Sequence, residues 1–344
     1  MAMATTRFRL PRAEAGRHIG PVMATSFLEL FRVLASFDPP RVDLSKAPWE
    51  AYVDWSIGQG LAPLAAYNLE YRLGPCGAPE WARDRLLALF QGTANDNVMK
   101  LVNFKQVVGG LEGRRVVLVG AASFADSLYP HVGFRPVIDL RCFMPSVDLD
   151  PFANYLGRGE FERDAAGTDP SRADRILTDH RTTVFLHGAL APRPELDQSL
   201  LARGLPMRAY GPSIYRFDLE DALLVQAVLM ARAGFGVPLL ELVDVRELVL
   251  GASAMGGPYS RVLKADDLKA RAIAWNAERA LWVVLGVVER LFPETAEAVA
   301  HLKPSLSFAV RELLDRLIVG PVAEVGRPSV FRGEETVRAL LVGG

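Results

Sequence analysis

Cysteine and lysine are both scarce in this sequence. Cys76 and Cys142 are the two cysteines of a 344-residue chain, and six of its 39 basic residues are lysine. Two cysteines are too few for a disulfide framework or a cysteine metal site, and Cys142 falls in an apolar strand pattern where a small buried side chain is expected. We therefore expect a protein of the reducing cytoplasm. In a chain so rich in Ala, Leu, Val and Gly, the preference for arginine indicates genome composition rather than phosphate recognition.

An excess of one charge and a long apolar segment are also missing. The chain carries 39 basic and 40 acidic side chains, a formal net charge of -1, which gives no overall attraction to nucleic acid or anionic lipid. The longest apolar run, residues 280–288, spans about half a bilayer, and residues 1–20 lack the apolar core of a signal peptide. We expect no nucleic-acid partner and no membrane segment. Residues 1–21 are predicted to be a flexible arm, with a basic arm for a partner as the alternative.

Apolar residues are abundant, and their spacing changes along the chain. Residues 22–112 show helical spacing, with two short helices around Gly58 and Gly60 and a long helix that begins at Pro79. Short β-branched runs alternate with helices over 113–216. Helical spacing returns over 217–320, where one long helix is expected at 266–291, and 321–344 is a tail. Because no linker is long enough to separate domains, this order predicts an α+β fold with a small mixed sheet flanked by N-terminal and C-terminal helical regions.

The segment FRPVIDLRCFMP, residues 134–145, reads as a buried strand with two charged residues. Because side chains alternate along a strand, Asp139 and Arg141 share one face, which is the candidate site. The opposite face is predicted to be core and consists of Ile138, Leu140, Cys142 and Met144. The same pattern predicts an earlier strand in RRVVLVG, which ends at Gly120, and a later one in TTVFLHG, residues 182–188.

Four motifs follow one another in an order that resembles a known family: LVGAAS (118–123), LYP (128–130), RPVIDL (135–140) and FLHGAL (185–190). They are similar to the motifs of a large bacterial family of mostly uncharacterised nucleotidyltransferases with the polymerase-beta-like minimal fold. The helical regions on both sides resemble those of the family as well. The likeness covers roughly residues 25–300.

The resemblance implies a nucleotidyltransferase-like core at 113–216. In that fold an acceptor attacks the α-phosphate of a nucleoside triphosphate, and two divalent ions clamp the attacking and leaving oxygens. Three carboxylates hold the ions: a pair about 7 Å apart on one strand, and a third on a neighbouring strand. By the same resemblance, Gly120 lets the backbone approach the triphosphate, and donors at Ala121 and Ser123, at the start of the next helix, hold its charge.

This chain keeps Gly120 and Asp139 but departs from the family pattern at three positions. Arg141 stands where the second acid belongs, Phe185 where the third belongs, and Val119 where a lysine often precedes the glycine. Asp139 with Arg141 sums to about zero charge, whereas three carboxylates give about -3. Since Mg²⁺ needs near-octahedral oxygen ligands, one carboxylate paired to a guanidinium is a poor anchor. We expect Asp139 to keep at most a residual catalytic or metal-binding role, and Mg²⁺ to be a cofactor only if the protein is active.

Three interpretations of Asp139 and Arg141 stay open. The first is a partly buried ion pair on the sheet face. The second is direct binding of a phosphate or carboxylate by Arg141 together with Arg135, because a guanidinium matches these oxyanions. The third is residual catalysis, with Asp126 or Asp148 supplying the missing acid.

His187, at the end of the third predicted strand, has two interpretations: a structural hydrogen bond or a contact to the nucleotide. For the whole protein we predict a catalytically degenerate member that binds a nucleotide, another anionic small molecule or a protein partner. The alternative is an active metal-dependent nucleotidyltransferase that transfers a nucleoside monophosphate to a small molecule or a protein.

Overall fold

The computed structural model describes residues 22–23, 27–108, 113–159, 161–163, 173–179, 182–207, 210–235, 237–251, 259 and 261–317. The predicted arm at 1–21 and tail at 321–344 lie outside these ranges. The helices are α1 (Phe27–Leu34), α2 (Trp49–Gly58), α3 (Ala62–Tyr67), α4 (Glu80–Val108), α5 (Ala121–Ser127), α6 (Ser146–Leu156), α7 (Pro194–Ala202), α8 (Leu219–Arg232), α9 (Leu239–Leu250), α10 (Ala265–Ala274), α11 (Glu278–Leu291), α12 (Ala296–Leu302) and α13 (Phe308–Leu317). A π-helical turn, Asn68–Arg72, extends α3.

A mixed seven-stranded sheet forms the centre of the α+β fold, in the order β5-β6-β7-β4-β3-β9-β8. Its strands are β3 (Val116–Val119), β4 (Asp139–Phe143), β5 (Glu162–Arg163), β6 (Arg175–Thr178), β7 (Thr183–His187), β8 (Leu205–Pro206) and β9 (Ile214–Arg216). A separate two-stranded pair joins β1 (Val22–Met23) to β2 (Val42–Asp43). At the centre, β4 runs antiparallel to β3 and parallel to β7. The three predicted strands are therefore adjacent, with the acid-bearing strand in the middle.

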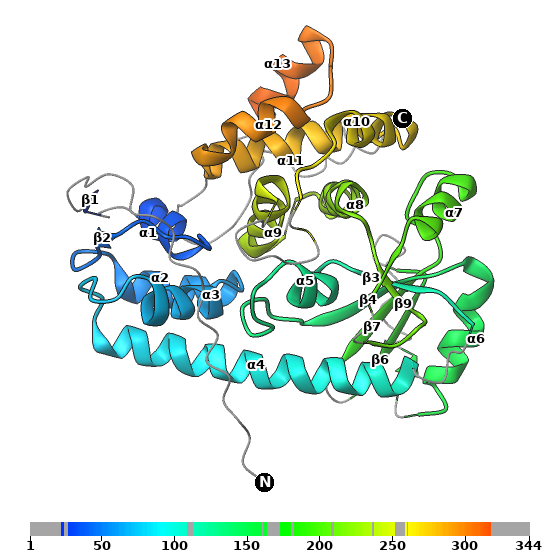
Figure 1. The fold of residues 1–344 in the computed structure, drawn as a ribbon, viewed down its shortest axis with the longest axis horizontal. Helices are drawn as coiled ribbons and strands as arrows, with labels where there is room; N and C mark the ends of the chain where they lie inside the picture. The colour runs from blue at the N-terminus through cyan, green and yellow to red at the C-terminus, as the bar shows by residue number, and fades with distance from the viewer. Residues whose placement is uncertain are drawn as a thin grey trace.

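Helices cover both faces of the sheet, as Figure 1 shows. The C-terminal half of α4 and helix α6 cover one face and pack against Leu140 and Cys142. The other face carries Val119 and Phe143, which join the larger core formed with α8, α9 and α11. This division confirms the predicted alternation along β4. Ile138 is an exception to the predicted core face. It precedes the strand, and its side chain is 71% exposed.

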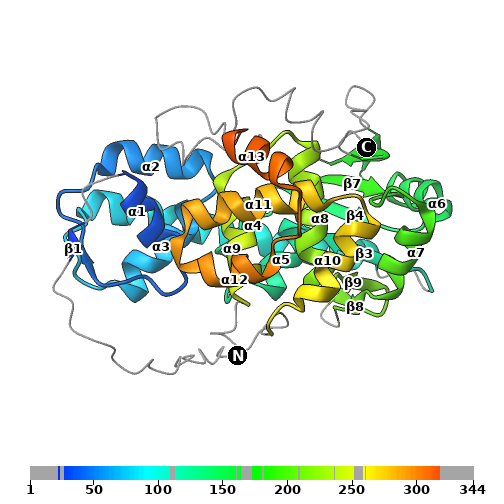
Figure 2. The same cartoon turned by 90° about the horizontal axis from the view of Figure 1, so that it is seen from above.

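The N-terminal and C-terminal helical regions share this larger core. Figure 2 shows α1 to α3 on one side of the sheet-bearing half, with α11 lying across toward α1. The guanidinium of Arg32 on α1 donates through Nη2 to the carbonyl of Arg290 on α11 at 2.9 Å. The helical regions around the sheet thus pack together as well as against it.

The C-terminal helix predicted at 266–291 is wrong in one respect, because it is divided into α10 and α11. Asn276 lies between them with a φ of 53°, a left-handed conformation that asparagine tolerates better than most residues and that ends a helix. Ile273, near the end of α10, is 64% exposed. No helix within the described residues is long and apolar enough to cross a membrane.

Candidate functional site

The registers of β4 and β7 bring the predicted site residues onto one face. Arg141 lies opposite Phe185 on β7 and opposite Val119 on β3. The guanidinium of Arg141 donates to Asp139 through Nε at 3.1 Å and through Nη2 at 3.3 Å. The two side chains are 35% and 20% exposed. The two side chains thus form a partly buried ion pair, with the ring of Phe185 beside the guanidinium, while the three interpretations of this pair stay open.

Gly120 forms the turn from β3 into α5, as predicted. Its backbone has φ 63° and ψ -131°, a combination that is essentially restricted to glycine. A Cβ at this position would lie 3.8 Å from Oε1 of Gln226. Ala121 is partly exposed, whereas Ser123 on α5 is buried, with 2% of its surface exposed. The contacts that the family resemblance implies for Ala121 and Ser123 stay predictions.

Arg135 lies before β4, and its ion-pair partner is on α9. It is buried, and its guanidinium donates to both carboxylate oxygens of Asp244 on α9, through Nη2 to Oδ2 at 2.8 Å and through Nε to Oδ1 at 3.1 Å. The hydroxyl of Tyr129 donates to the same carboxylate at 2.7 Å. Burial lowers the pKa of Arg135, but the charge of Asp244 outweighs burial and the net shift is upward. Arg135 is thus a charged residue that ties the segment before β4 to α9.

Asn97 on α4 fixes the same segment from the other side. Its Nδ2 donates to the carbonyls of Val132 and Arg135 at 2.6 and 2.8 Å, and its Oδ1 accepts from the amide of Val137 at 2.9 Å. Asn97 is fully buried, whereas its apolar neighbour Val98 is 46% exposed. Because these bonds satisfy the backbone of a loop, they hold the approach to β4 in place.

Sequence reasoning missed Glu241 and Gln226. Nε2 of Gln226 on α8 donates to Oε2 of Glu241 on α9 at 3.0 Å. Burial raises the pKa of Glu241, while the charges of Arg135 and Arg141 lower it and that of Asp139 raises it. Glu241 is therefore a carboxylate whose charge interacts with those of Arg135, Arg141 and Asp139. The available signal was a glutamate in the first turn of a helix whose charged residues are mostly buried.

His187 ends β7 and is 5% exposed. Its Nε2 is buried and has no hydrogen-bond partner among the described residues. Burial and the charge of Arg141 lower its pKa to about 4, against the opposing charges of Asp174 and Asp139. His187 is neutral at pH 7 and has an unsatisfied ring nitrogen, while both interpretations of its role stay open.

Of the two other acids considered for the site, Asp148 forms an ion pair with an arginine other than Arg141. Asp148 lies in the first turn of α6 and pairs with Arg114 at 3.4 Å. The charge of Asp126 on α5 interacts with Arg216, while burial raises its pKa. Among the described residues, no group of three or more His, Cys, Asp and Glu side chains is placed to hold a metal ion.

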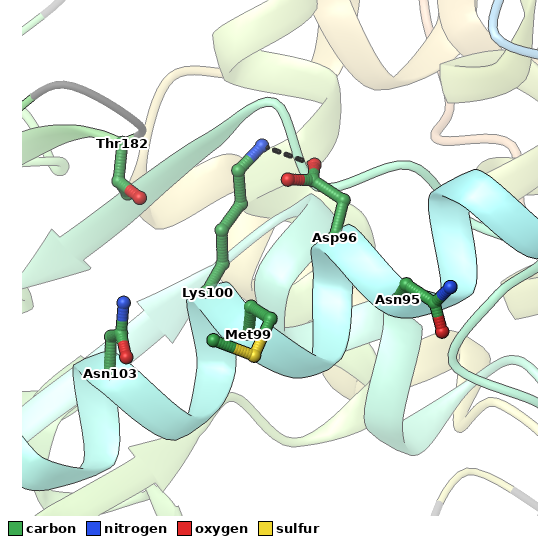
Figure 3. A pocket seen from close by; sticks show the side chains of 6 residues that line it. All are labelled: Asn95, Asp96, Met99, Lys100, Asn103 and Thr182. Carbon is green, nitrogen blue, oxygen red and sulfur yellow. Dashed lines mark ion pairs between the residues drawn. The ribbon is translucent and has the colours of Figure 1, made fainter.

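A cavity of about 320 Å³ lies along α4 (Figure 3). Lys100 crosses it and pairs with Asp96 at 2.7 Å. The same ammonium donates to the carbonyl of Val137 at 2.9 Å. The lining residues are Asn95, Asp96, Met99, Lys100, Asn103 and Thr182. None of them was predicted as a site residue.

Comparison with known families gives one match, which spans residues 45–293 and includes the sheet, Gly120, Asp139 and His187. The chain belongs to this family, described as uncharacterised nucleotidyltransferases. No curated protein matches the chain. No solved structure matches it either.

Proposed function

We propose that this nucleotidyltransferase-family protein binds a nucleotide or a similar anionic ligand at the face of β4 without a divalent ion, and that it does not transfer nucleotidyl groups. The observation that carries the proposal is the ion pair between Asp139 and Arg141. It places a fixed positive charge where two-ion chemistry needs a second carboxylate.

Electrostatics supports the absence of two-ion chemistry. Two unit charges 4 Å apart interact by about 4 kcal/mol at an effective dielectric constant of about 20. Replacing an attracting carboxylate by a repelling guanidinium therefore costs a bound dication several kcal/mol. Phe185, which lies opposite Arg141, offers no oxygen ligand. The residues present do not fit the pair of ions that the family pattern implies.

The ligand-binding part of the proposal rests on Arg141 alone. Arg135 is committed to Asp244, so the expected two-arginine site reduces to one arginine. Asp139 engages Nε and Nη2 of Arg141. The guanidinium is partly exposed, and its remaining nitrogen, Nη1, would donate a charge-assisted hydrogen bond to an oxyanion of the ligand. The neutral ring of His187 supplies Nε2 as a second polar atom for the ligand. The charges of Arg141 and Asp139 also act on this ring.

Isothermal titration calorimetry with ATP, GTP, CTP, UTP and inorganic pyrophosphate tests the proposal, first with Mg²⁺ and then with EDTA. We expect the affinity for the bound ligand to be the same in both conditions, with no release of pyrophosphate from a triphosphate. Arg141→Met keeps the apolar stem of the side chain and removes its charge. Because a hydrogen bond to a charged group is worth about 1.5–3 kcal/mol, this variant should bind about ten- to a hundredfold more weakly.

Arg72→Met is the matched control. Arg72 is also a partly exposed arginine, 29% exposed, and pairs with one aspartate, Asp38, at 2.7 Å in the N-terminal helical region. Its replacement should leave the affinity unchanged. Binding that requires Mg²⁺ and releases pyrophosphate would establish the competing hypothesis, an active metal-dependent nucleotidyltransferase. Failure of all five compounds to bind would refute the ligand-binding part.

A further inference from the structure

The outer side of helix α4 carries a regular stripe of exposed residues. Its members recur at alternating steps of three and four residues, the spacing of the a and d positions of a coiled coil. This α4 stripe consists of Trp81, Arg85, Ala88, Gly92, Asn95, Met99 and Val102, all of them exposed. The opposite side of α4 is buried, with Leu86 in the larger core and Leu101 against the sheet. Figure 1 shows α4 along one edge of the molecule, so the stripe is open to a partner.

The composition of the α4 stripe is unusual for a helix face in contact with water, which normally carries charged and polar residues. Met99 is 48% exposed, and Trp81 and Val102 are each 44% exposed. Arg85 is the charged member of the stripe, and it pairs with Asp54 on α2 at 2.8 Å. The stripe therefore presents apolar and small side chains along most of its length, as a helix-packing surface does.

The sizes of the central residues fit a second copy of α4 in the antiparallel direction. Ala88 and Gly92 are small, and a Cβ on Gly92 would meet nothing within 4 Å. With Gly92 of one copy opposite Asn95 of the other, Ala88 lies opposite Met99, because positions shift in opposite directions along antiparallel helices. Each small residue then accommodates a larger one. In a parallel pair each residue would meet itself, leaving a gap at Gly92 and two methionines in one layer.

Charge complementarity favours the same direction. Asp84 and Lys105 are both exposed and lie three heptads apart, so they occupy the same flank of the α4 stripe. In the antiparallel arrangement, Asp84 of each copy lies close to Lys105 of the other, and the dimer contains two such opposite-charge pairs. In a parallel arrangement each residue would lie beside its own counterpart of the same sign.

We propose that the α4 stripe is the interface of a symmetric homodimer, in which it packs antiparallel against the same stripe of a second copy. A two-fold axis uses one self-complementary surface twice. Because α4 is already folded in each copy, association does not have to order it. Residues 81–102 rise by about 33 Å, and one helix pair of this length buries less than the about 1,600 Å² of a standard interface. We therefore expect a dissociation constant in the micromolar range.

The dimer leaves the candidate ligand site open. Helix α4 packs on the face of the sheet that carries Leu140 and Cys142, whereas Asp139 and Arg141 alternate with these residues along β4 and lie on the other face. The homodimer is therefore an inference beyond the proposed function and does not depend on it.

Sedimentation velocity of the full chain over a concentration series tests the dimer. The wild type should change from monomer to dimer as its concentration rises. Met99→Glu should weaken the self-association at least about tenfold, because it would bury a carboxylate without a partner. Ile273→Glu is the matched control, since Ile273 is an apolar residue on α10 that is 64% exposed, and it should associate like the wild type. Circular dichroism checks folding, and Ala88→Glu replaces any Met99→Glu protein that does not fold.

Chemical cross-linking tests the direction of the two helices. Cys76 and Cys142 are both buried, so a cysteine introduced on α4 is the accessible thiol. A mixture of the Asp84→Cys and Lys105→Cys proteins should be joined by a short bismaleimide much more efficiently than either protein alone. The reason is that the antiparallel arrangement brings positions 84 and 105 of different copies together.

Three results would count against the proposal. A wild type that stays monomeric at every concentration would overturn it, whatever else then covers the stripe. A dimer that neither Met99→Glu nor Ala88→Glu weakens would overturn it too, because its interface would lie elsewhere. Cross-linking of Asp84→Cys alone as efficient as that of the mixture would show that the copies are parallel. None of these measurements uses a ligand of the β4 face, so they leave the proposed function to its own test.

Discussion

Arg135 and Asp244 form a buried ion pair across 109 positions of sequence, with Nη2 of the arginine 2.8 Å from Oδ2 of the aspartate. The Asp244 side chain is fully buried and that of Arg135 is 8% exposed. The pair joins the segment that leads into β4 to helix α9, which carries Glu241. The pair therefore holds the segment before β4 against α9.

Asp244→Asn should destabilise the protein by about 3–5 kcal/mol, because it leaves the Arg135 charge buried without its counter-charge. Urea unfolding measures the free energy of unfolding. Asp38→Asn is the control, since Asp38 is 76% exposed and pairs with Arg72, and a surface pair is worth about 0–1 kcal/mol. Similar losses in the two variants would show that the buried pair has no special structural role.

Gly120→Ala should destabilise the protein by about 1–3 kcal/mol, because alanine is strained at φ 63° and ψ -131°. Gly92→Ala is a matched control with the opposite expected sign. Gly92 lies inside α4, and a Cβ there would meet nothing within 4 Å, so alanine should stabilise the helix by about 0.5–1 kcal/mol. Thermal unfolding compares the two, and a Gly120→Ala protein as stable as the wild type would contradict a glycine-only turn.

The stability of the wild type should fall between pH 6.5 and pH 4 partly because of His187. Its folded-state pKa is about 4, below the usual value of 6.5, so the unfolded chain binds the proton first as the pH falls. The contribution of the neutral ring is complete above pH 6.5 and is lost toward pH 4. A fall of the pKa from 6.5 to about 4 corresponds to about 3 kcal/mol, at about 1.4 kcal/mol per pH unit.

His187→Gln provides the comparison, because it removes this titration and leaves Asp139, Arg141, Asp174 and Arg232, which surround the ring, in place. Urea unfolding at a series of pH values should show a shallower acid loss in the variant. Parallel pH profiles for the two proteins would mean that His187 titrates normally in the folded state.

The sequence was enough to predict those strands and helices that are marked by a pattern among neighbouring residues. The β-branched run before Gly120 and the alternation along β4 predicted the strands. The Asp139–Arg141 pair was also accessible, because residues two apart on a strand share a face. For the same reason Phe185 was expected to face the site, and the register places it opposite Arg141.

The rest depends on contacts between residues far apart in the sequence. Arg135 was expected beside Arg141, but its partner is 109 positions away, and no local pattern reveals such a pairing. The bond between Gln226 and Glu241 joins two different helices, α8 and α9. The break at Asn276 was missed because the apolar spacing continues across it and asparagine is a weaker helix-ending signal than glycine.

Mn²⁺ binding by the wild type, with and without ATP, tests the central claim most directly. The account predicts no saturable Mn²⁺ site under either condition, because Arg141 neutralises Asp139 and repels a dication. A saturable site in the wild type that disappears in Asp139→Asn would contradict it, and would show that this chain holds a catalytic ion in spite of its arginine.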